Sequence, residues 1–313
     1  MKREYIYAGI SIFLWSTTAT VTKLLLGNLN SIQIMLISSF FALIFLLGMN
    51  LCMGTLKELK NYKLFDYIQI FLIGFLGIFL YHLLLYLGID NMEASQAFII
   101  NYLWPIMAVL SACINLKERI TLKKIIAIIL SFIGVIVVTV NGDLLNVEKD
   151  TLVGAIYCIL AAISYGLFTV INKKKNYNKY LSMMLYYFSA FIISFVYAFV
   201  TGEYITLSFS EGIGMLWNGI FATAIPFTTW ALALEKGDTA KISNLAYITP
   251  FLSMVWTCFI LKEDLNIYSI IGLAIIVSGI LIQLKELKCI VQLNLKVVME
   301  MQERQVLYCM VNL

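Results

Sequence analysis

The feature that most constrains this chain is a series of long apolar runs separated by short polar breaks. A membrane-spanning helix needs about 20 mostly apolar residues. Ten such runs follow one another, at residues 6–26, 32–53, 65–88, 94–116, 122–141, 152–172, 180–201, 213–234, 240–261 and 267–285. Within a bilayer only helices and closed barrels satisfy every backbone polar group. The pattern therefore predicts an all-α integral membrane protein with ten transmembrane helices.

The composition argues against the soluble classes of protein. The 313 residues are 61% hydrophobic and 13% charged, with a mean hydropathy of +0.91, whereas soluble chains have about 45–50% apolar and about 25% charged residues. So few charges do not coat a water-facing surface, which disfavours a soluble enzyme, a secreted disulfide scaffold and a nucleic-acid-binding protein. The six cysteines are scattered singly with no histidine nearby. We therefore predict no metal site, disulfide framework or cofactor.

The basic residues predict the orientation in the membrane. Lysine and arginine favour cytoplasmic loops, and 19 of the 22 fall on one face if the N-terminus is cytoplasmic. The exceptions are Lys23, Lys149 and Lys262. An even number of spans then places both termini inside. Residues 286–313 are expected to form a cytoplasmic tail, either an interfacial or disordered segment or a helix that binds a partner.

The sequence also contains an internal repeat. A shift of 145 residues aligns Gly74 with Gly219, Pro105 with Pro250, Gly134 with Gly279, and residues 113–118 with 258–263. A shift of 150 aligns residues 15–23 with 165–173. These matches predict two five-helix repeats, at 1–141 and 152–285. Because five is odd, the second repeat enters the membrane inverted, which is an architecture of many secondary transporters. An ancient duplication in a non-transporting membrane protein is the alternative.

Two prolines lie near the middle of their spans, at matching positions of the repeats. Pro105 and Pro250 each remove a backbone donor and free the carbonyl four residues earlier, at Asn101 and Ala246. Broken helices at matching depth indicate a binding site, although a tolerated kink is also compatible. Polar and aromatic side chains gather at the same depth: Trp15, Asn101, Tyr102, Trp104, Tyr165, Tyr247 and Thr249. Rings with polar atoms at this depth favour an amphipathic organic ligand.

His82 is the only histidine, and it shares one face of the third span with Tyr86. An ionisable residue inside a span is a candidate functional group, so His82 is expected to bind a substrate carboxylate or carry a proton. A neutral packing histidine is the alternative. The pairs Lys117-Glu118 and Lys262-Glu263 fit either gates between the repeats or solvated helix ends.

A chain with these features resembles proteins of the drug/metabolite transporter superfamily, specifically its EamA-type members. The resemblance covers roughly residues 5–285. Asn101-Tyr102-Leu103-Trp104-Pro105 and Leu14-Trp15-Ser16-Thr17 are similar to motifs of the bacterial aromatic amino-acid exporters. The chain departs from that pattern where Tyr165 replaces a tryptophan, and in its long tail. The resemblance implies a cavity lined by the first, third, fourth, sixth, eighth and ninth helices. Residues carried over by position are Trp15, Tyr81, His82, Tyr86, Tyr102, Trp104, Tyr165 and Pro250.

The sequence therefore predicts a multi-pass transporter of the inner or plasma membrane, with no catalytic residues. We expect it to export amino acids, aromatic or otherwise neutral, and related metabolites by alternating access. A drug, a sugar derivative or a lipid carrier is the alternative cargo; a membrane enzyme or a structural protein is disfavoured. Its expected partners are the small-molecule substrate and the lipid bilayer, not nucleic acid. The oligomeric state is left open, and a monomer is compatible with the fold. The full set of predicted binding residues is Trp15, Tyr81, His82, Tyr86, Asn101, Tyr102, Trp104, Pro105, Tyr165, Tyr247, Thr249 and Pro250.

Overall fold

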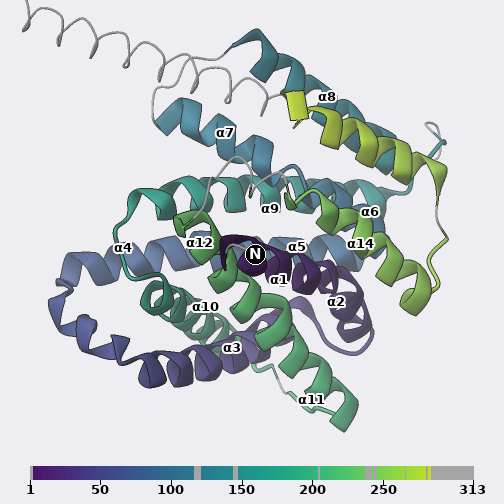
Figure 1. Cartoon of the computed structure of the whole chain (residues 1–313). Coiled ribbons are helices and arrows are strands. Elements are labelled where there is room, and N and C mark those ends of the chain that lie inside the picture. The colour runs from purple at the N-terminus through teal and green to yellow at the C-terminus, as the bar shows by residue number, and fades with distance from the viewer. Residues whose placement is uncertain are drawn as a thin grey trace, which may run out of the picture.

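A computed structural model shows a bundle of helices (Figure 1). It describes residues 3–115, 121–143, 147–203, 205–236, 242, 245–264, 266–279 and 281–282. Within those ranges the regular elements are all helical, as the apolar runs predict. The predicted tail 286–313 and the Lys117-Glu118 pair lie outside the described residues.

Each of the ten apolar runs contains helix in its described part. The elements are α1 (Arg3–Ser16), α2 (Thr18–Leu26), α3 (Ser31–Met53), η1 (Thr55–Asn61), α4 (Leu64–Gly74), η2 (Phe75–Leu80), α5 (Tyr81–Asn91), α6 (Ala94–Asn101), α7 (Trp104–Asn115), α8 (Leu122–Val140), α9 (Lys149–Lys174), α10 (Lys179–Thr201), α11 (Phe209–Leu216), η3 (Trp217–Ala224), α12 (Ile225–Lys236), α14 (Ile248–Trp256) and η4 (Thr257–Leu261), followed by a helix over Ile267–Gly279.

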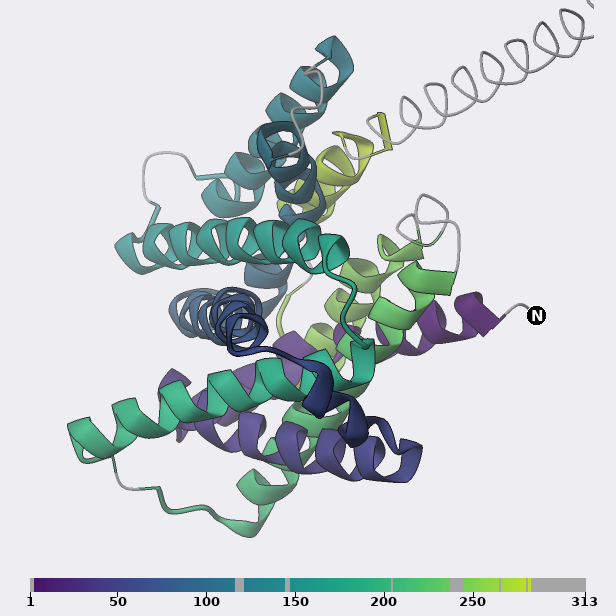
Figure 2. The same cartoon turned by 90° about the vertical axis from the view of Figure 1, so that its left-hand side faces the viewer.

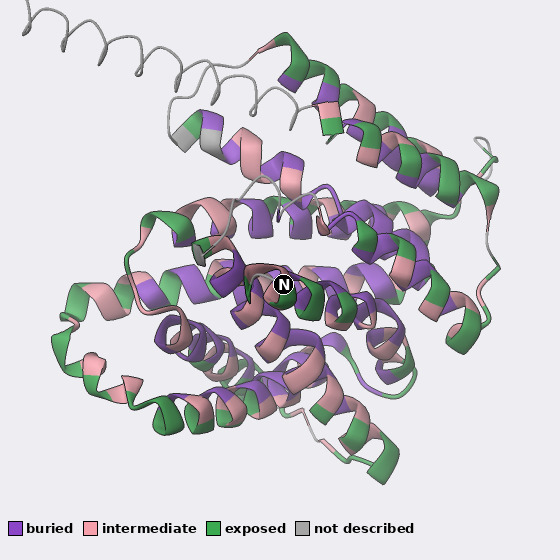
Figure 3. Cartoon of the chain, viewed as in Figure 1, coloured by how far each residue is buried: buried purple, intermediate pink, exposed green. Residues whose placement is uncertain are grey.

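Among the described residues, seven helical stretches are long and apolar enough to cross a membrane, and two further apolar helices are shorter. Large apolar side chains are exposed around the outside of the bundle, including Phe199 at 79% and Phe209 at 87%. Figure 3 shows exposed residues along the outer helices. A water-soluble monomer rarely exposes apolar surface on this scale. The molecule is therefore an integral membrane protein whose outer side chains face lipid.

Several spans are interrupted near their middle. α1 ends at Ser16 and α2 begins at Thr18, and the Thr17 amide bonds the carbonyl of Leu14 at 3.1 Å in a tighter turn. The fourth apolar run breaks between α6 and α7, at residues 102–103, and the ninth has turns at residues 246–247, before α14. The last two breaks lie just ahead of Pro105 and Pro250, where a proline disrupts the preceding turn.

Two of the wide-turn helical segments occupy matching positions along the chain. η2 and η3 are both π-helical, and they follow Gly74 and include Gly219, the glycines aligned by the 145-residue shift. A Cβ added at Gly74 would lie 2.0 Å from Ser189 Oγ on α10, and one at Gly219 would lie 2.5 Å from the Ser38 carbonyl on α3. Each glycine therefore lets its helix approach a neighbouring span closely.

The fifth and tenth apolar runs pack against each other at one side of the bundle. A Cβ at Gly134 on α8 would lie 2.7 Å from the Gly272 carbonyl, and one at Gly279 would lie 2.8 Å from the Ala127 carbonyl. Figure 2 shows α8 beside the yellow-green helix over Ile267–Gly279, above the layer of α9 and α5. α9 in turn packs along α5 and α7. The centre of the bundle therefore lies on the side of α9 that faces away from α8.

Candidate functional site

A cavity lies at the centre of the bundle, where the interrupted helices meet. Its lining residues come from α1, α2, α5, α6, the α6–α7 break, α7, α9, η3 and α12. They are Trp15, Thr18, Tyr81, His82, Leu85, Phe98, Asn101, Tyr102, Trp104, Tyr165, Ala222 and Phe227. The cavity therefore draws on both halves of the chain and brings together segments more than 200 residues apart in sequence.

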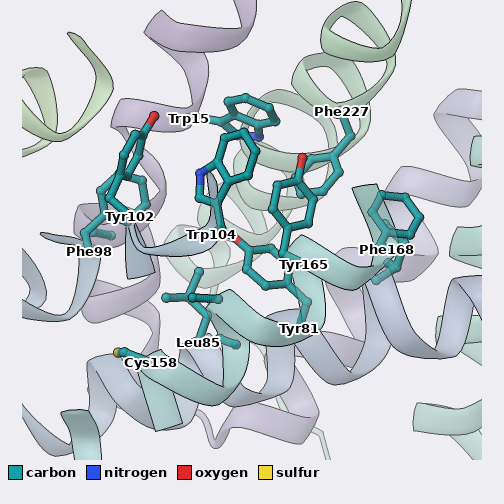
Figure 4. Close-up of a cluster of buried hydrophobic side chains, with 14 of the residues drawn as sticks. Trp15, Tyr81, Leu85, Phe98, Tyr102, Trp104, Cys158, Tyr165, Phe168 and Phe227 are labelled. Carbon is teal, nitrogen blue, oxygen red and sulfur yellow. The ribbon is translucent and has the colours of Figure 1, made fainter. Parts of the chain in front are cut away.

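Aromatic rings form most of the cavity wall (Figure 4). Tyr81 stacks on Tyr165 with ring centroids 4.7 Å apart, and Trp104 meets Tyr165 edge-on at 5.1 Å. Trp15 meets Phe227 edge-on at 5.3 Å and packs at the same distance from Trp230. These separations and angles are those of favourable aromatic pairs. The rings therefore support one another and present flat apolar faces to the cavity.

Three polar atoms on the cavity wall are buried without a hydrogen-bond partner: Trp15 Nε1, Thr18 Oγ1 and Asn101 Oδ1. The amide nitrogen of Asn101 is engaged, because it donates to the Tyr81 hydroxyl at 3.1 Å. An unmade hydrogen bond at a buried polar atom costs about 1–3 kcal/mol. One free donor, one free acceptor and one hydroxyl that serves as either are thus available to a bound molecule.

His82 lies on the cavity wall directly after the η2 segment and is 2% exposed. Its Nδ1 is 2.8 Å from the Ile78 carbonyl oxygen. Because a carbonyl oxygen only accepts, Nδ1 carries the proton of this bond, and the other ring nitrogen accepts when the ring is neutral. The Ser164 hydroxyl of α9 donates to the Leu76 carbonyl at 2.6 Å. Side chains thus satisfy two carbonyls of η2, which is consistent with the placement of π-helical turns at functional sites.

The backbone carbonyl that Pro250 frees accepts a bond from the other half of the chain. The Tyr102 hydroxyl donates to the Ala246 carbonyl oxygen at 2.5 Å. Tyr102 lies in the break between α6 and α7, and Ala246 lies in the break before α14. The Ala246 carbonyl oxygen also accepts from the Thr249 amide at 3.0 Å, so both of its lone pairs are used and it is not available to a ligand in this structure.

Seven of the twelve predicted binding residues line the cavity: Trp15, Tyr81, His82, Asn101, Tyr102, Trp104 and Tyr165. Tyr86, Pro105, Tyr247, Thr249 and Pro250 do not. The Tyr86 hydroxyl instead accepts a bond from Asn218 Nδ2 at 3.0 Å. In the described part of the chain, the ninth apolar run contributes no lining residue, in contrast to the expected set of helices.

Five lining residues are not among the twelve predicted binding residues: Thr18, Leu85, Phe98, Ala222 and Phe227. Leu85, Phe98 and Phe227 are ordinary apolar residues of a span and carry no signal of their own. Thr18 follows the Trp15-Ser16-Thr17 motif, and its position three residues after Trp15 is the one available clue. Periodicity relative to a known lining residue could have found Leu85, because it is four residues after Tyr81.

The chemistry of the wall limits what the cavity accepts. Among the described residues that line it, none is an aspartate, glutamate, lysine or arginine. About 20 Å³ is open to the centre of a water-sized molecule, whereas one such position needs about 10–15 Å³. The cavity as it stands therefore has room for one or two water molecules, and its side chains must move before an organic molecule enters. The wall suits a flat apolar group with a compact polar end and no net charge.

Comparison with known proteins agrees with this architecture. The chain is 26% identical to an uncharacterized transporter of Clostridium kluyveri, covering 90% of this chain and 93% of that protein. It is 24% identical to an uncharacterized transporter of Archaeoglobus fulgidus, covering 91% and 99%. A solved crystal structure with 18% identity shares the fold, with a TM-score of 0.67 over 90% of this chain and 96% of that one.

The model of the EamA-like transporter family matches two stretches of the chain, residues 2–140 and 152–284. Together these stretches include every residue that lines the cavity. They also include the helices whose apolar outer surfaces indicate a membrane protein. The chain belongs to the EamA-like transporter family, within the drug/metabolite transporter superfamily.

Proposed function

We propose that this protein exports amino acids with an aromatic or other neutral side chain, and related metabolites, across the inner or plasma membrane. The observation that carries the proposal is an aromatic cavity that has unpartnered polar atoms and no fixed charge among its described lining residues. Aromatic side chains stack on such rings. A zwitterion carries two ionised ends, and hydrogen bonds from the free polar atoms of the wall would offset the cost of burying each of them.

The two ends of a zwitterion match the free polar groups of the wall. An ammonium group donates hydrogen bonds, and Asn101 Oδ1 is an unpartnered acceptor. A carboxylate accepts hydrogen bonds, and Trp15 Nε1 is an unpartnered donor. His82 offers a further acceptor when neutral. These residues form the proposed binding site for the amino-acid head group, with Trp104, Tyr81 and Tyr165 around the side chain.

The proposed mechanism is alternating access between two inverted repeats, residues 1–141 and 152–285, joined into ten spans with both termini in the cytoplasm. The matched π-helical segments η2 and η3 and the matched close contacts of Gly74 and Gly219 support the repeat. A cavity lined from both halves supports a shared central site. The substrate binds without covalent chemistry.

Uptake of radiolabelled solutes into proteoliposomes tests the proposed substrate. The panel contains aromatic, aliphatic and basic amino acids, together with an organic cation and a sugar derivative. We expect saturable uptake of aromatic or other neutral amino acids. Uptake of only the cation or the sugar derivative would indicate that the cargo is another class of solute. Uptake of no amino acid by well-folded protein would overturn the proposal.

Trp104→Ala tests whether the cavity is the site of transport. Loss of the indole ring removes an aromatic surface of the cavity wall, which contacts Tyr165 edge-on with ring centroids 5.1 Å apart. We expect uptake to fall by about tenfold or more, since 1.4 kcal/mol of lost binding gives a factor of about ten. Phe199→Ala is the matched control, because Phe199 is 79% exposed on the outer surface. Equal uptake by the two variants would place the site elsewhere.

A further inference from the structure

Two charged side chains hold the short turn between α5 and α6 from opposite sides. Lys23 Nζ, on α2, donates to the Ile89 carbonyl oxygen at 2.6 Å and to the Met92 carbonyl oxygen at 2.9 Å. The Glu263 carboxylate accepts from the Ala94 amide at 2.8 Å and from the Ser95 amide at 3.0 Å. We call Lys23, Glu263 and residues 89–95 the turn clamp.

The charges of the turn clamp complement the two helix ends that they touch. The last carbonyls of a helix carry partial negative charge, and its first amides carry partial positive charge. Lys23 binds at the carbonyl end of α5, and Glu263 binds at the amide end of α6. Lys262 has a left-handed backbone, with φ +62°, which ends η4 immediately before Glu263. The first, third, fourth and ninth apolar runs are thereby joined at one end of the bundle.

The same helices lead from the turn clamp to the cavity. On α2 the lining residue Thr18 is five residues before Lys23, and on α5 Leu85 is four residues before Ile89. On α6 the lining residue Phe98 is three residues after Ser95. Thr22 and Ala97, which lie between the clamp and the cavity on α2 and α6, are each 0% exposed, as is Ile89 of the clamp itself. Closely packed side chains therefore seal this end of the cavity.

The lysine at the matching position of the second half makes different contacts from those of Lys23. The 150-residue shift aligns Lys23 with Lys173, near the end of α9. Lys173 is exposed, and its side chain makes no hydrogen bond within the described part of the chain. The two aligned lysines thus differ: one holds a turn between helices, and the other is free in solvent.

We propose that the turn clamp is a gate, which closes the cavity toward one membrane face and releases when the cavity opens to that face. This inference rests on the proposed alternating-access function. A closed gate needs contacts that are short-range and reversible. Hydrogen bonds from one lysine and one glutamate to backbone groups meet both needs, because they form and break without unfolding either helix.

Accessibility of a single cysteine at position 22 tests the gate. The six native cysteines are replaced by alanine in the full chain, Thr22→Cys is introduced, and the protein is reconstituted in liposomes. A membrane-impermeant maleimide is then added, and the rate of labelling is measured. Glu263→Gln and Lys23→Gln should each raise that rate by about tenfold, the ratio given by about 1.4 kcal/mol of lost helix-end interaction.

Two matched variants control for charge alone. Asp264→Asn removes the neighbouring carboxylate, which is exposed and accepts no hydrogen bond from the described residues. Lys173→Gln removes the aligned lysine. Both should label at the rate of the parent protein. Labelling of Glu263→Gln and Lys23→Gln at that same rate, with elution as folded monodisperse protein, would overturn the gate and leave the clamp as a static helix cap.

Two further choices keep the test decisive. Lys23→Arg and Glu263→Asp retain the charge and change only the reach of the side chain, so they replace the glutamine variants if those do not fold. The labelling assay needs no substrate. Faster labelling without amino-acid uptake would therefore support the gate and reject only the proposed cargo, whereas uptake with unchanged labelling would reject only the gate.

Discussion

At the scale of single residues, the unpartnered polar atoms of the cavity indicate a bound ligand more directly than its aromatic rings do. Asn101 is 2% exposed and uses its amide nitrogen on Tyr81, yet its oxygen has no partner. Packing alone gives no reason to retain such a group, because a buried unsatisfied acceptor is destabilising. A ligand that donates to this oxygen supplies the reason.

Asn101→Leu is expected to separate function from stability. The leucine has nearly the same shape; it removes the unpartnered oxygen but also the amide that donates to the Tyr81 hydroxyl, and because these two effects oppose each other the melting temperature in detergent should change little. Uptake of the amino-acid substrate should fall by about tenfold, because a hydrogen bond to a charged ammonium group contributes about 1.5–3 kcal/mol. A variant that transports at the wild-type rate would remove Asn101 from the head-group site.

Glu93 gives a prediction about pH. It lies in the loop between α5 and α6, outside the spans, where burial and the nearby carboxylates Glu263 and Asp264 raise its pKa above the ordinary 4.5, and Lys23 lowers it in part. A carboxyl group whose pKa is raised in the folded state stabilises the fold while it is protonated, and that stability is lost as the pH rises through its folded pKa. Ionised Glu93 therefore opposes folding at neutral pH.

Glu93→Gln should accordingly melt at a higher temperature than the wild type at pH 7. The difference should shrink as the pH falls and disappear below about 4.5, where the wild-type carboxyl group is protonated in both the folded and the unfolded state. Thermal unfolding in detergent across this pH range measures the effect. A difference in melting temperature that does not change with pH would show that the charge of Glu93 is not its cause.

At the scale of elements, the helices are positioned by glycines at which a side chain has no room. Gly74 faces α10 and Gly219 faces α3, each at the start of or within a π-helical segment. These contacts bring the third and eighth apolar runs against their neighbours and set where the following residues, including His82 and Phe227, enter the cavity. Close approach at glycine is a common device of helices packed in lipid.

Gly74→Ala and Gly219→Ala should each destabilise the fold by about 1–3 kcal/mol, the usual cost of overpacking. Gly48→Ala on α3 is the matched control, since a Cβ at Gly48 meets nothing within 4 Å. That variant should stabilise its helix by up to about 1 kcal/mol. Thermal unfolding in detergent compares the three. Equal effects of all three substitutions would contradict the importance of these contacts.

At the scale of the whole molecule, the distribution of basic residues bears on orientation and hence on the direction of transport. If the chain has the ten predicted spans and a cytoplasmic N-terminus, 19 of the 22 lysines and arginines lie on the cytoplasmic face. The bias operates during insertion through short loops near the ends of the spans. In that predicted orientation the turn clamp, with Lys23 and Glu263, would lie toward the outside.

Reporter fusions check this orientation. A green fluorescent protein joined after residue 313 should fluoresce in bacteria, and alkaline phosphatase joined at the same place should be inactive, because phosphatase folds only outside the cytoplasm. Phosphatase joined after Glu203, in the loop that follows α10, should be active. The reverse pattern would invert the topology and place the turn clamp on the cytoplasmic face.

Much of the element pattern was predictable because the bilayer imposes a simple rule on length and polarity. The run 32–53 became α3 (Ser31–Met53), and the run 122–141 became α8 (Leu122–Val140). The prediction of an all-helical membrane protein of the EamA type is confirmed. The breaks before Pro105 and Pro250 were also predictable, since proline cannot donate to the preceding turn.

The sequence by itself determined that the chain is a helical membrane protein of the EamA type and where most of its apolar helices lie, because length, polarity and proline act locally along the chain. Only the tertiary structure decided which residues form the cavity and the turn clamp. In lipid, apolar side chains cover both the outer surface and the interior, so Phe98 and exposed Phe199 look alike in sequence. Bonds such as those of Glu263 to residues 94 and 95 depend on how distant helices pack.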